Sequence, residues 1–176
     1  MGQEIDERLD PFELESAQRL DAIPGVARGV ADVVIAEIGT DLSRFPSADH
    51  LASWVALCPG NNESAGKRKS GKIRKGNQAL RTVLVQAAHA ASMKTGSYLQ
   101  AQFRRLAARI GRKKAIIATA RQILVIIYHL LRNPTSIFNE KGAHYMKGEQ
   151  AERTKRHHLR QLEALGFRVN LETATA

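Results

Sequence analysis

Residues 64–139 form a 76-residue segment that contains 16 Lys and Arg but no Asp or Glu. The segment also contains long apolar runs such as AIIATARQILVIIYHLL (115–131). It therefore belongs to a folded core rather than to a flexible basic tail.

Residues 1–63 carry 12 acids against 4 Lys and Arg, and residues 140–176 carry 5 acids against 7 Lys and Arg. Because the central segment cannot neutralise its own cations, we expect it to attract a polyanion, and nucleic acid is the natural candidate. A solvated basic surface packed against acidic neighbours is the alternative.

Length and cysteine content exclude several classes of protein. A chain of 176 residues, 43% of them hydrophobic, predicts about one folded domain. The single cysteine, Cys58, excludes an intramolecular disulfide and a cysteine-type zinc site. The longest apolar run, Ile123–Leu131, is shorter than the roughly 20 residues that a bilayer span requires, and no metal site is readable. We therefore expect a soluble cytoplasmic protein without a membrane partner.

Apolar periodicity predicts an all-α fold of five or six helices. An opening helix over residues 5–20 is expected to break or kink near Pro11 and to end before Pro24 and Gly25. A helix over 30–38 should end at Gly39. The other expected elements are a short helix over 48–57 (capped by Ser47), longer helices over 79–93 (capped by Asn77), 97–110, 112–132 and 149–166, and a short strand over 167–171.

Residues 59–77, PGNNESAGKRKSGKIRKGN, show neither a helical nor a strand period. They contain four Gly, two Ser and six Lys or Arg. The pattern predicts a long basic loop, and long loops in compact domains are usually functional or disordered.

The string LDAIPGVARGVADVVIAEI (20–38) is typical of a helix-hairpin-helix, in which a Pro-Gly turn joins two short helices. Gly25 permits close approach of the backbone, and amides at a helix N-terminus can hold a phosphate. We therefore interpret Gly25 and Val26 as a candidate backbone phosphate site. A plain pair of antiparallel helices with a tight turn is the alternative.

Ser64 is the candidate nucleophile within residues 59–77. Attack on a phosphodiester requires loss of the serine proton and stabilisation of the developing oxyanions, and clustered Lys and Arg favour both. The small neighbours Ala65 and Gly66 would let a nucleic-acid backbone approach closely. The alternative is a loop that only contacts phosphates without sequence preference.

Several blocks taken in order give the chain a more specific likeness. The blocks are IPGV, AEIGTDLSRFPSADHLASWVALCPGNNESAGKRKSGKIRKGN, LRTVLVQAA and YLQAQFRRLAARIGRKKAIIATARQILVIIYHLL. Together, from about residue 20 to 171, they resemble the C-terminal domain of bacterial insertion-sequence transposases of the IS-one-ten and IS-one-sixteen type, the bridge-RNA-guided recombinases.

The resemblance implies a DNA transposase activity with a serine nucleophile, which aligns with Ser64 in PGNNESAGK. It implies cleavage through a 5′-phosphoserine link, composite sites assembled from several subunits, and a noncoding guide RNA. Family members also carry an N-terminal RuvC-like domain with four acidic metal ligands, which the acids Asp6, Glu7, Asp10 and Glu13 do not reproduce. We therefore expect a chain without that domain and without a cofactor of its own, the Mg²⁺ belonging to the RuvC-like domain.

The expected organisation has three parts. Residues 1–19 would be the remnant of a linker, residues 20–140 the transposase C-terminal domain with its helix-hairpin-helix (20–38) and serine loop (59–77), and residues 141–176 a C-terminal helix and tail. Expected partners are DNA, a guide RNA, further copies of the chain or a RuvC-like domain, within the bacterial nucleoid. The residues expected to bind DNA or RNA are Gly25, Val26, Lys67, Arg68, Lys69, Lys72, Arg74, Lys75, Arg81, Arg104, Arg105, Arg109, Arg112, Lys113 and Lys114.

Two other functions stay open at this point. One is a nucleic-acid-binding remnant of a transposase without catalysis. The other is a structural or oligomerisation module whose basic surface binds acidic proteins. The general base for Ser64 is unassigned.

Overall fold

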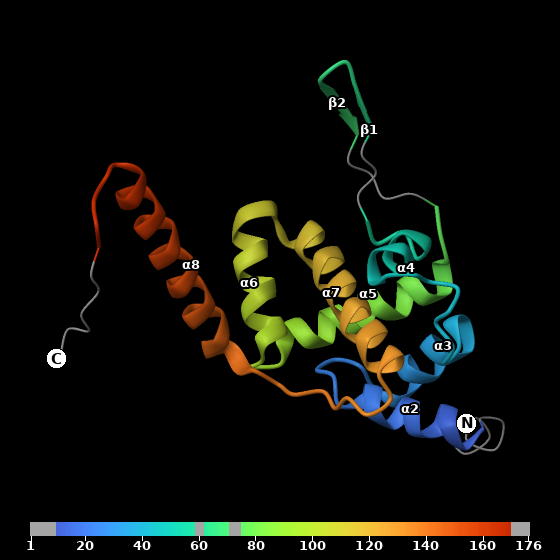
Figure 1. Ribbon diagram of the computed structural model, residues 1–176. Coiled ribbons are helices and arrows are strands. Elements are labelled where there is room, and N and C mark those ends of the chain that lie inside the picture. Colours follow the sequence, from blue (N-terminus) through green and yellow to red (C-terminus); the bar gives the residue numbers. More distant parts are fainter. Residues whose placement is uncertain (1–9, 59–61, 71–74, 170–176) are drawn as a thin grey trace.

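The computed structural model describes residues 10–58, 62–70 and 75–169 and shows a helical body with one β-hairpin. The helices are α2 (Pro11–Asp21), α3 (Arg28–Ile38), α4 (Ala48–Trp54), α5 (Gln78–Met93), α6 (Tyr98–Ile110), α7 (Arg112–Arg132) and α8 (Gly142–Ala164). The hairpin strands are β1 (Asn62–Ser64) and β2 (Lys67–Ser70). Figure 1 shows the hairpin rising from one end of the body and α8 projecting from its side.

Helix α7 is the centre of the fold and packs against α2, α4, α5 and α6. Its side chains Ile123, Leu124 and Ile127 are fully buried, as are Leu80 and Leu84 on α5. Burying a side chain of this size contributes roughly 1.5–3 kcal/mol. Helix α7 is also long and apolar enough to cross a bilayer, but more than half of its most apolar window is buried inside the fold, as in a core helix.

The C-terminal end of α7 is held by an arginine from another helix. The Arg19 guanidinium on α2 donates to the carbonyl oxygens of Leu130 at 3.1 Å and Pro134 at 2.6 Å. A cation at this end also interacts favourably with the helix dipole. This contact links the first described helix to the central one.

The expectation of a helical fold is confirmed, but the described residues contain seven α-helices where five or six are expected, and several elements begin or end elsewhere. Helix α2 begins at Pro11, where a break or kink is expected, because Asp10 is extended, caps the helix and forms a capping box with Glu13. Residues 1–9 lie outside the described residues. Helix α8 begins at Gly142, seven residues earlier than expected, and residues 167–169 are not in a strand.

Candidate nucleic-acid interface

The hairpin is attached to the body between α4 and α5. Gly76 lies so close to α4 that a Cβ there would come within 2.6 Å of the Trp54 carbonyl oxygen and 2.9 Å of the Ala56 nitrogen. The Asn77 N–H donates to the same carbonyl at 3.4 Å. Ala56 itself has a positive φ of 63°, which turns the chain out of α4. Both stems of the hairpin therefore leave the body at one point.

Asn77 connects the base of the hairpin to two helices, α5 and α3. Its side chain accepts from the Leu80 N–H at 2.9 Å and so caps α5, as the sequence predicted. Its Nδ2 donates to Glu37 Oε2 on α3 at 2.5 Å. Sequence reasoning missed this second contact, because the two residues are 40 positions apart.

The tip of the hairpin is a two-residue turn. Ser64 pairs with Lys67 across it, and the intervening Ala65 and Gly66 have φ of 52° and 73°. Two consecutive positive φ values are what a type I′ turn requires, and this turn matches the twist of the flanking strands. Ala65, Gly66 and Lys67 are exposed, so the turn is open to solvent.

The expected loop over 59–77 is therefore a hairpin in its central part. The strands carry Asn-Glu-Ser and Lys-Arg-Lys-Ser, with no apolar residue on either face. Strand prediction depends on apolar alternation, which an exposed hairpin does not need. The one available signal was the short Ala-Gly turn between two polar runs.

Ser64 is the last residue of β1, next to the turn, and its backbone alone is described. Arg68 and Lys69 follow Lys67 on β2, and their side chains also lie outside the described part of the structure. Lys75 is exposed at the base of the hairpin. Lys72 and Arg74 lie outside the described residues. The Arg81 guanidinium, on the first turn of α5, donates to the Gln78 side chain.

The Pro-Gly turn between α2 and α3 faces the body. A Cβ at Gly25 would overlap the carbonyl oxygen of Ala87 and lie 2.6 Å from the Ala91 nitrogen on α5. The Val26 N–H donates to the Ile23 carbonyl at 3.0 Å, and the Val26 side chain is buried. The structure thus gives Gly25 a packing role, and phosphate binding by these two residues stays a prediction.

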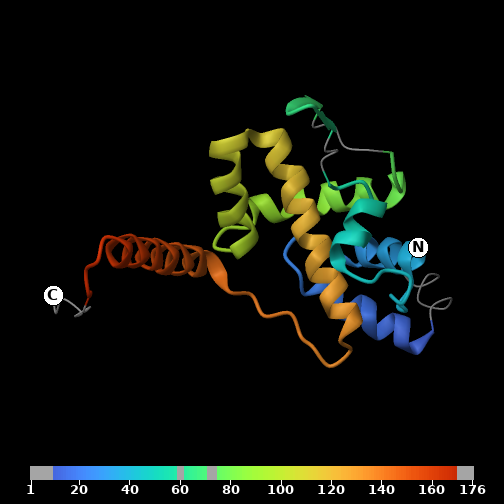
Figure 2. The same cartoon turned by 45° about the horizontal axis from the view of Figure 1, so that its top comes forward.

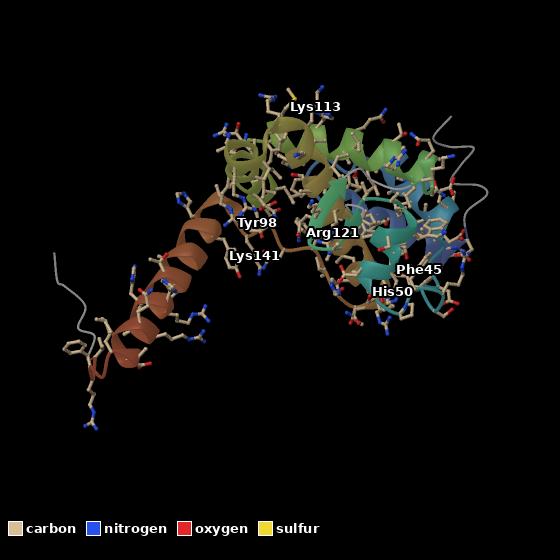
Figure 3. The ribbon with its side chains drawn as sticks, turned by 90° about the horizontal axis from the view of Figure 1, so that it is seen from above. Phe45, His50, Tyr98, Lys113, Arg121 and Lys141 are labelled. Carbon is tan, nitrogen blue, oxygen red and sulfur yellow. The ribbon has the colours of Figure 1, made fainter. Side chains whose placement is uncertain are left out.

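The six cations at the end of α6 and the start of α7 are brought together. Arg104, Arg105 and Arg109 are exposed on α6, and Arg112, Lys113 and Lys114 are exposed on the first turn of α7. This cluster and the hairpin stand at the same end of the molecule in Figures 1 and 2. Figure 3 looks down on this end and shows Lys113 at its rim, with Arg121 nearer the centre.

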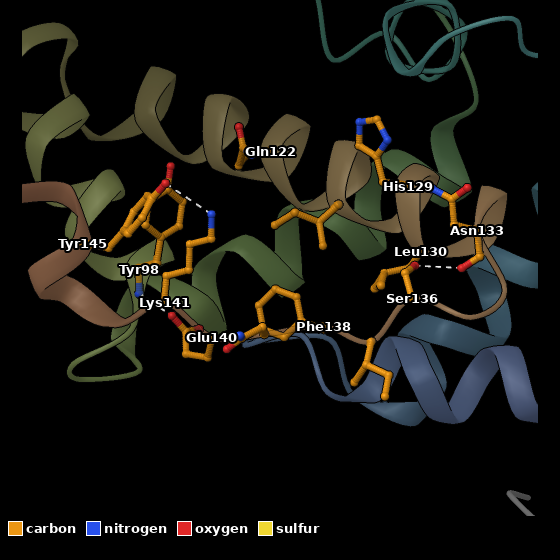
Figure 4. Close-up of a pocket in the computed structure, with 13 residues that line it drawn as sticks. Tyr98, Gln122, His129, Leu130, Asn133, Ser136, Phe138, Glu140, Lys141 and Tyr145 are labelled. Atoms are coloured by element: carbon orange, nitrogen blue, oxygen red, sulfur yellow. Dashed lines mark hydrogen bonds between the residues drawn. The ribbon is translucent and has the colours of Figure 1, made fainter. Parts of the chain in front are cut away.

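Two cavities lie along α7 away from the hairpin. The first, of about 520 Å³, is between α7 and the segment 133–141 that crosses below it, and it is lined by Tyr98, Phe138 and Tyr145 (Figure 4). The second, of about 580 Å³, is bordered by Arg121 and Arg132. The Arg121 guanidinium pairs with Asp49 on α4. Neither cavity includes a residue of the hairpin, so neither holds the predicted chemistry.

Within the described residues, no group of three or more His, Cys, Asp or Glu side chains could hold a metal ion. Asp10 and Glu13 form the capping box of α2 instead. The described part of the chain therefore does not fit a carboxylate metal centre.

Comparison with known proteins identifies the family. A family profile described as "Transposase IS116/IS110/IS902 family" matches residues 17–104, half of the chain. "Putative transposase y4pF/y4sB" of Sinorhizobium fredii is 36% identical over 75 residues, 42% of this chain and 19% of that relative. The match thus spans about a fifth of the relative's length. The matched region runs from the second half of α2 through α3, α4, the hairpin and α5 to the first half of α6. The chain belongs to the IS116/IS110/IS902 family of transposases.

Proposed function

We propose that this chain supplies the serine nucleophile for DNA strand cleavage and rejoining in transposition, and that Ser64 is that nucleophile. The observation that carries the proposal is the position of Ser64 at the last residue of β1, beside an exposed two-residue turn. A projecting hairpin can enter a groove or reach a strand that the helical body cannot approach.

The reaction is an exchange of phosphodiester oxygens. The Ser64 hydroxyl loses its proton to a base that is not assigned, and its Oγ attacks the phosphorus of the scissile phosphate. A P–Oγ bond forms, the P–O3′ bond breaks, and the leaving 3′ oxygen takes up a proton. The product is a 5′-phosphoserine ester and a free 3′ hydroxyl. Attack by another 3′ hydroxyl on the same phosphorus rejoins the strand and restores the serine.

Cations near the turn would stabilise the charge that develops on the phosphate oxygens. We assign this role to Lys67, Arg68 and Lys69 on β2, and to Lys72, Arg74, Lys75 and Arg81, which follow β2 in the sequence. Residues 64–139 contain no carboxylate, and the nearest acid along the chain is Glu63 on β1, which lies opposite Arg68 in the strand register. The Asn77–Glu37 contact and the close packing of Gly76 support the proposal, because they fix the base of the hairpin to α3 and α4.

The partners follow from the family likeness. We propose that DNA is the substrate, that a guide RNA is bound as well, and that a RuvC-like domain supplies the acidic metal ligands that the described residues lack. Mg²⁺ bound in such a domain would activate a phosphate or a water, and none of the described residues would hold it. Several copies of the chain would assemble around the DNA.

A suicide substrate tests the nucleophile. Nicked DNA duplexes with randomised sequence around the nick lose their short 3′-hydroxyl fragment after cleavage, so the covalent intermediate accumulates. We expect a protein–DNA adduct with the wild-type chain, with or without an added RuvC-like domain from a family member, and none with Ser64→Ala. Ser70→Ala, at the end of the opposite strand, is the matched control and should leave the adduct intact.

An undiminished adduct in Ser64→Ala would contradict the proposal. If wild-type protein forms no adduct in either arm yet still binds the duplex, the chain is a nucleic-acid-binding member of the family without catalysis. If it binds neither duplex DNA nor structured RNA at low salt, a structural module is the better description.

A further inference from the structure

The junction of α6 and α7 concentrates positive charge without any compensating acid. We call Arg104, Arg105, Arg109, Arg112, Lys113 and Lys114 the α6–α7 basic turn. All six are exposed. The ion pairs found among the described residues are Arg28–Asp32, Arg121–Asp49 and Lys155–Glu152, so none involves this turn.

Three of these cations lie at the N-terminal end of a helix, where the helix dipole makes a positive charge unfavourable. Arg112, Lys113 and Lys114 are the first three residues of α7, at the positive end of the dipole of a 21-residue helix. The first turn of α7 contains no acid, and Gly111 before it provides no side-chain cap. Acidic residues are the ones that stabilise this position. We therefore expect the free protein to be less stable with these lysines than with neutral residues.

Packing does not account for the lysines. The Arg112 guanidinium lies 6.0 Å from the centroid of the Phe103 ring and so has a structural contact of its own. Within the described part of the chain, the side chains of Lys113 and Lys114 have no hydrogen bond or ion pair. A cluster of exposed cations that no internal acid neutralises creates a positive field, which favours a bound polyanion.

We propose that the α6–α7 basic turn binds the sugar-phosphate backbone of a nucleic acid, through Lys113 and Lys114 above all, as a second contact separate from the hairpin. The turn stands at the same end of the molecule as the hairpin, so one nucleic acid can contact both (Figures 1 and 2). Lys113 lies at the rim of that end in Figure 3. The choice of partner rests on the proposed function, but the site itself does not require Ser64 to be a nucleophile.

The double variant Lys113→Gln/Lys114→Gln tests the site through two measurements, the melting temperature and the DNA affinity, which should change in opposite directions. Its melting temperature without ligand should rise by about 1–4 °C at low salt, because two unfavourable charges are removed from the helix end. Its affinity for a fluorescent 30-base-pair DNA duplex should fall, by roughly eightfold for each lost phosphate contact at 0.1 M salt. The slope of log affinity against log salt should become shallower by about two.

Lys94→Gln is the matched control. Lys94 is exposed and follows the last residue of α5, at the opposite end of α6 from the basic turn. A cation there is favourable to the helix dipole, so its loss should not raise the melting temperature and should leave DNA affinity and salt slope unchanged. A structured RNA titrated in parallel tells whether DNA or RNA loses more affinity and so which backbone the turn contacts.

Unchanged affinity and salt slope for both nucleic acids in the double variant would overturn the proposal. An equal loss with Lys94→Gln would also overturn it, because the effect would then reflect overall charge rather than this site. Ser64→Ala keeps full affinity if the two sites are separate, so failure of the nucleophile and failure of the basic turn give different results.

Discussion

Replacing Gly25 with alanine tests whether the Pro-Gly turn is built for packing against α5. Gly25 has a φ of 87°, and its new Cβ would overlap the Ala87 carbonyl oxygen and press against the Ala91 nitrogen and Cβ at 2.6 and 2.9 Å. Left-handed backbone at a residue other than glycine costs about 1–2 kcal/mol. Forcing a methyl group into a packed interface adds about 1–3 kcal/mol. We therefore expect a loss of about 2–5 kcal/mol, a large part of a typical stability of about 5–15 kcal/mol.

Gly29→Ala is the control for this experiment. Gly29 lies in the first turn of α3 and has no atom within 4 Å of a built Cβ. Alanine is the better helix former there, so this variant should be unchanged or more stable, by up to about 1 kcal/mol. Urea denaturation followed by helical circular dichroism gives both values. A loss below about 1 kcal/mol in Gly25→Ala, together with weaker DNA binding, would refute the packing role and favour a phosphate contact.

Three further variants test other parts of the account. Arg19→Met removes the guanidinium from the carbonyls at the end of α7 and should lower the free energy of unfolding by about 1–3 kcal/mol in urea denaturation. Asn77→Ala removes the cap of α5 and the contact with Glu37, so it should lower stability by about 1–2 kcal/mol and also weaken covalent DNA capture in the suicide-substrate assay. The N–H and Oγ of Ser43 donate to Asp41 and lower the pKa of that carboxyl from its ordinary 3.8, so any stability from this contact is fully present above that pH and is lost as the pH falls through the lowered pKa. Ser43→Ala should raise the Asp41 pKa, which a carboxyl NMR titration measures.

The helices are predictable because their boundaries depend on local residues. Ser47 and Asn77 cap α4 and α5 as expected, and Gly39 and Gly111 end α3 and α6 with positive φ. Capping depends on hydrogen bonds within three or four positions along the chain, so a single sequence contains the information.

Contacts between distant residues are not predictable in the same way. Arg19 reaches carbonyls more than 110 positions away, and Asn77 reaches Glu37 across 40. The tight contact of Gly25 with α5 depends on how three helices pack, so the sequence indicates a turn but not the face that the turn presents. Such contacts follow from tertiary packing, which no local pattern specifies.

The candidate site is predictable in composition but not in form. Clustered cations and the absence of acids are enough to single out residues 64–139 from the sequence. The same sequence predicts a loop where Ser64 lies in a hairpin, because the strands of that hairpin are polar on both faces. The sequence also predicts that α8 begins at residue 149 rather than at Gly142, because Gly142 and Gly148 interrupt the helical pattern. Strands and helices made mostly of polar residues show little apolar periodicity, so the sequence predicts them poorly.

The attachment point of DNA on this chain is the measurement that tests the central claim most directly. The adduct formed on the nicked duplexes would be digested with nuclease and protease and its peptides sequenced by mass spectrometry. We predict a nucleotide phosphate on the peptide that contains Ser64, and on Ser64 itself. A phosphate mapped to Ser70 or to any other residue would contradict the account, as would an adduct that survives in Ser64→Ala.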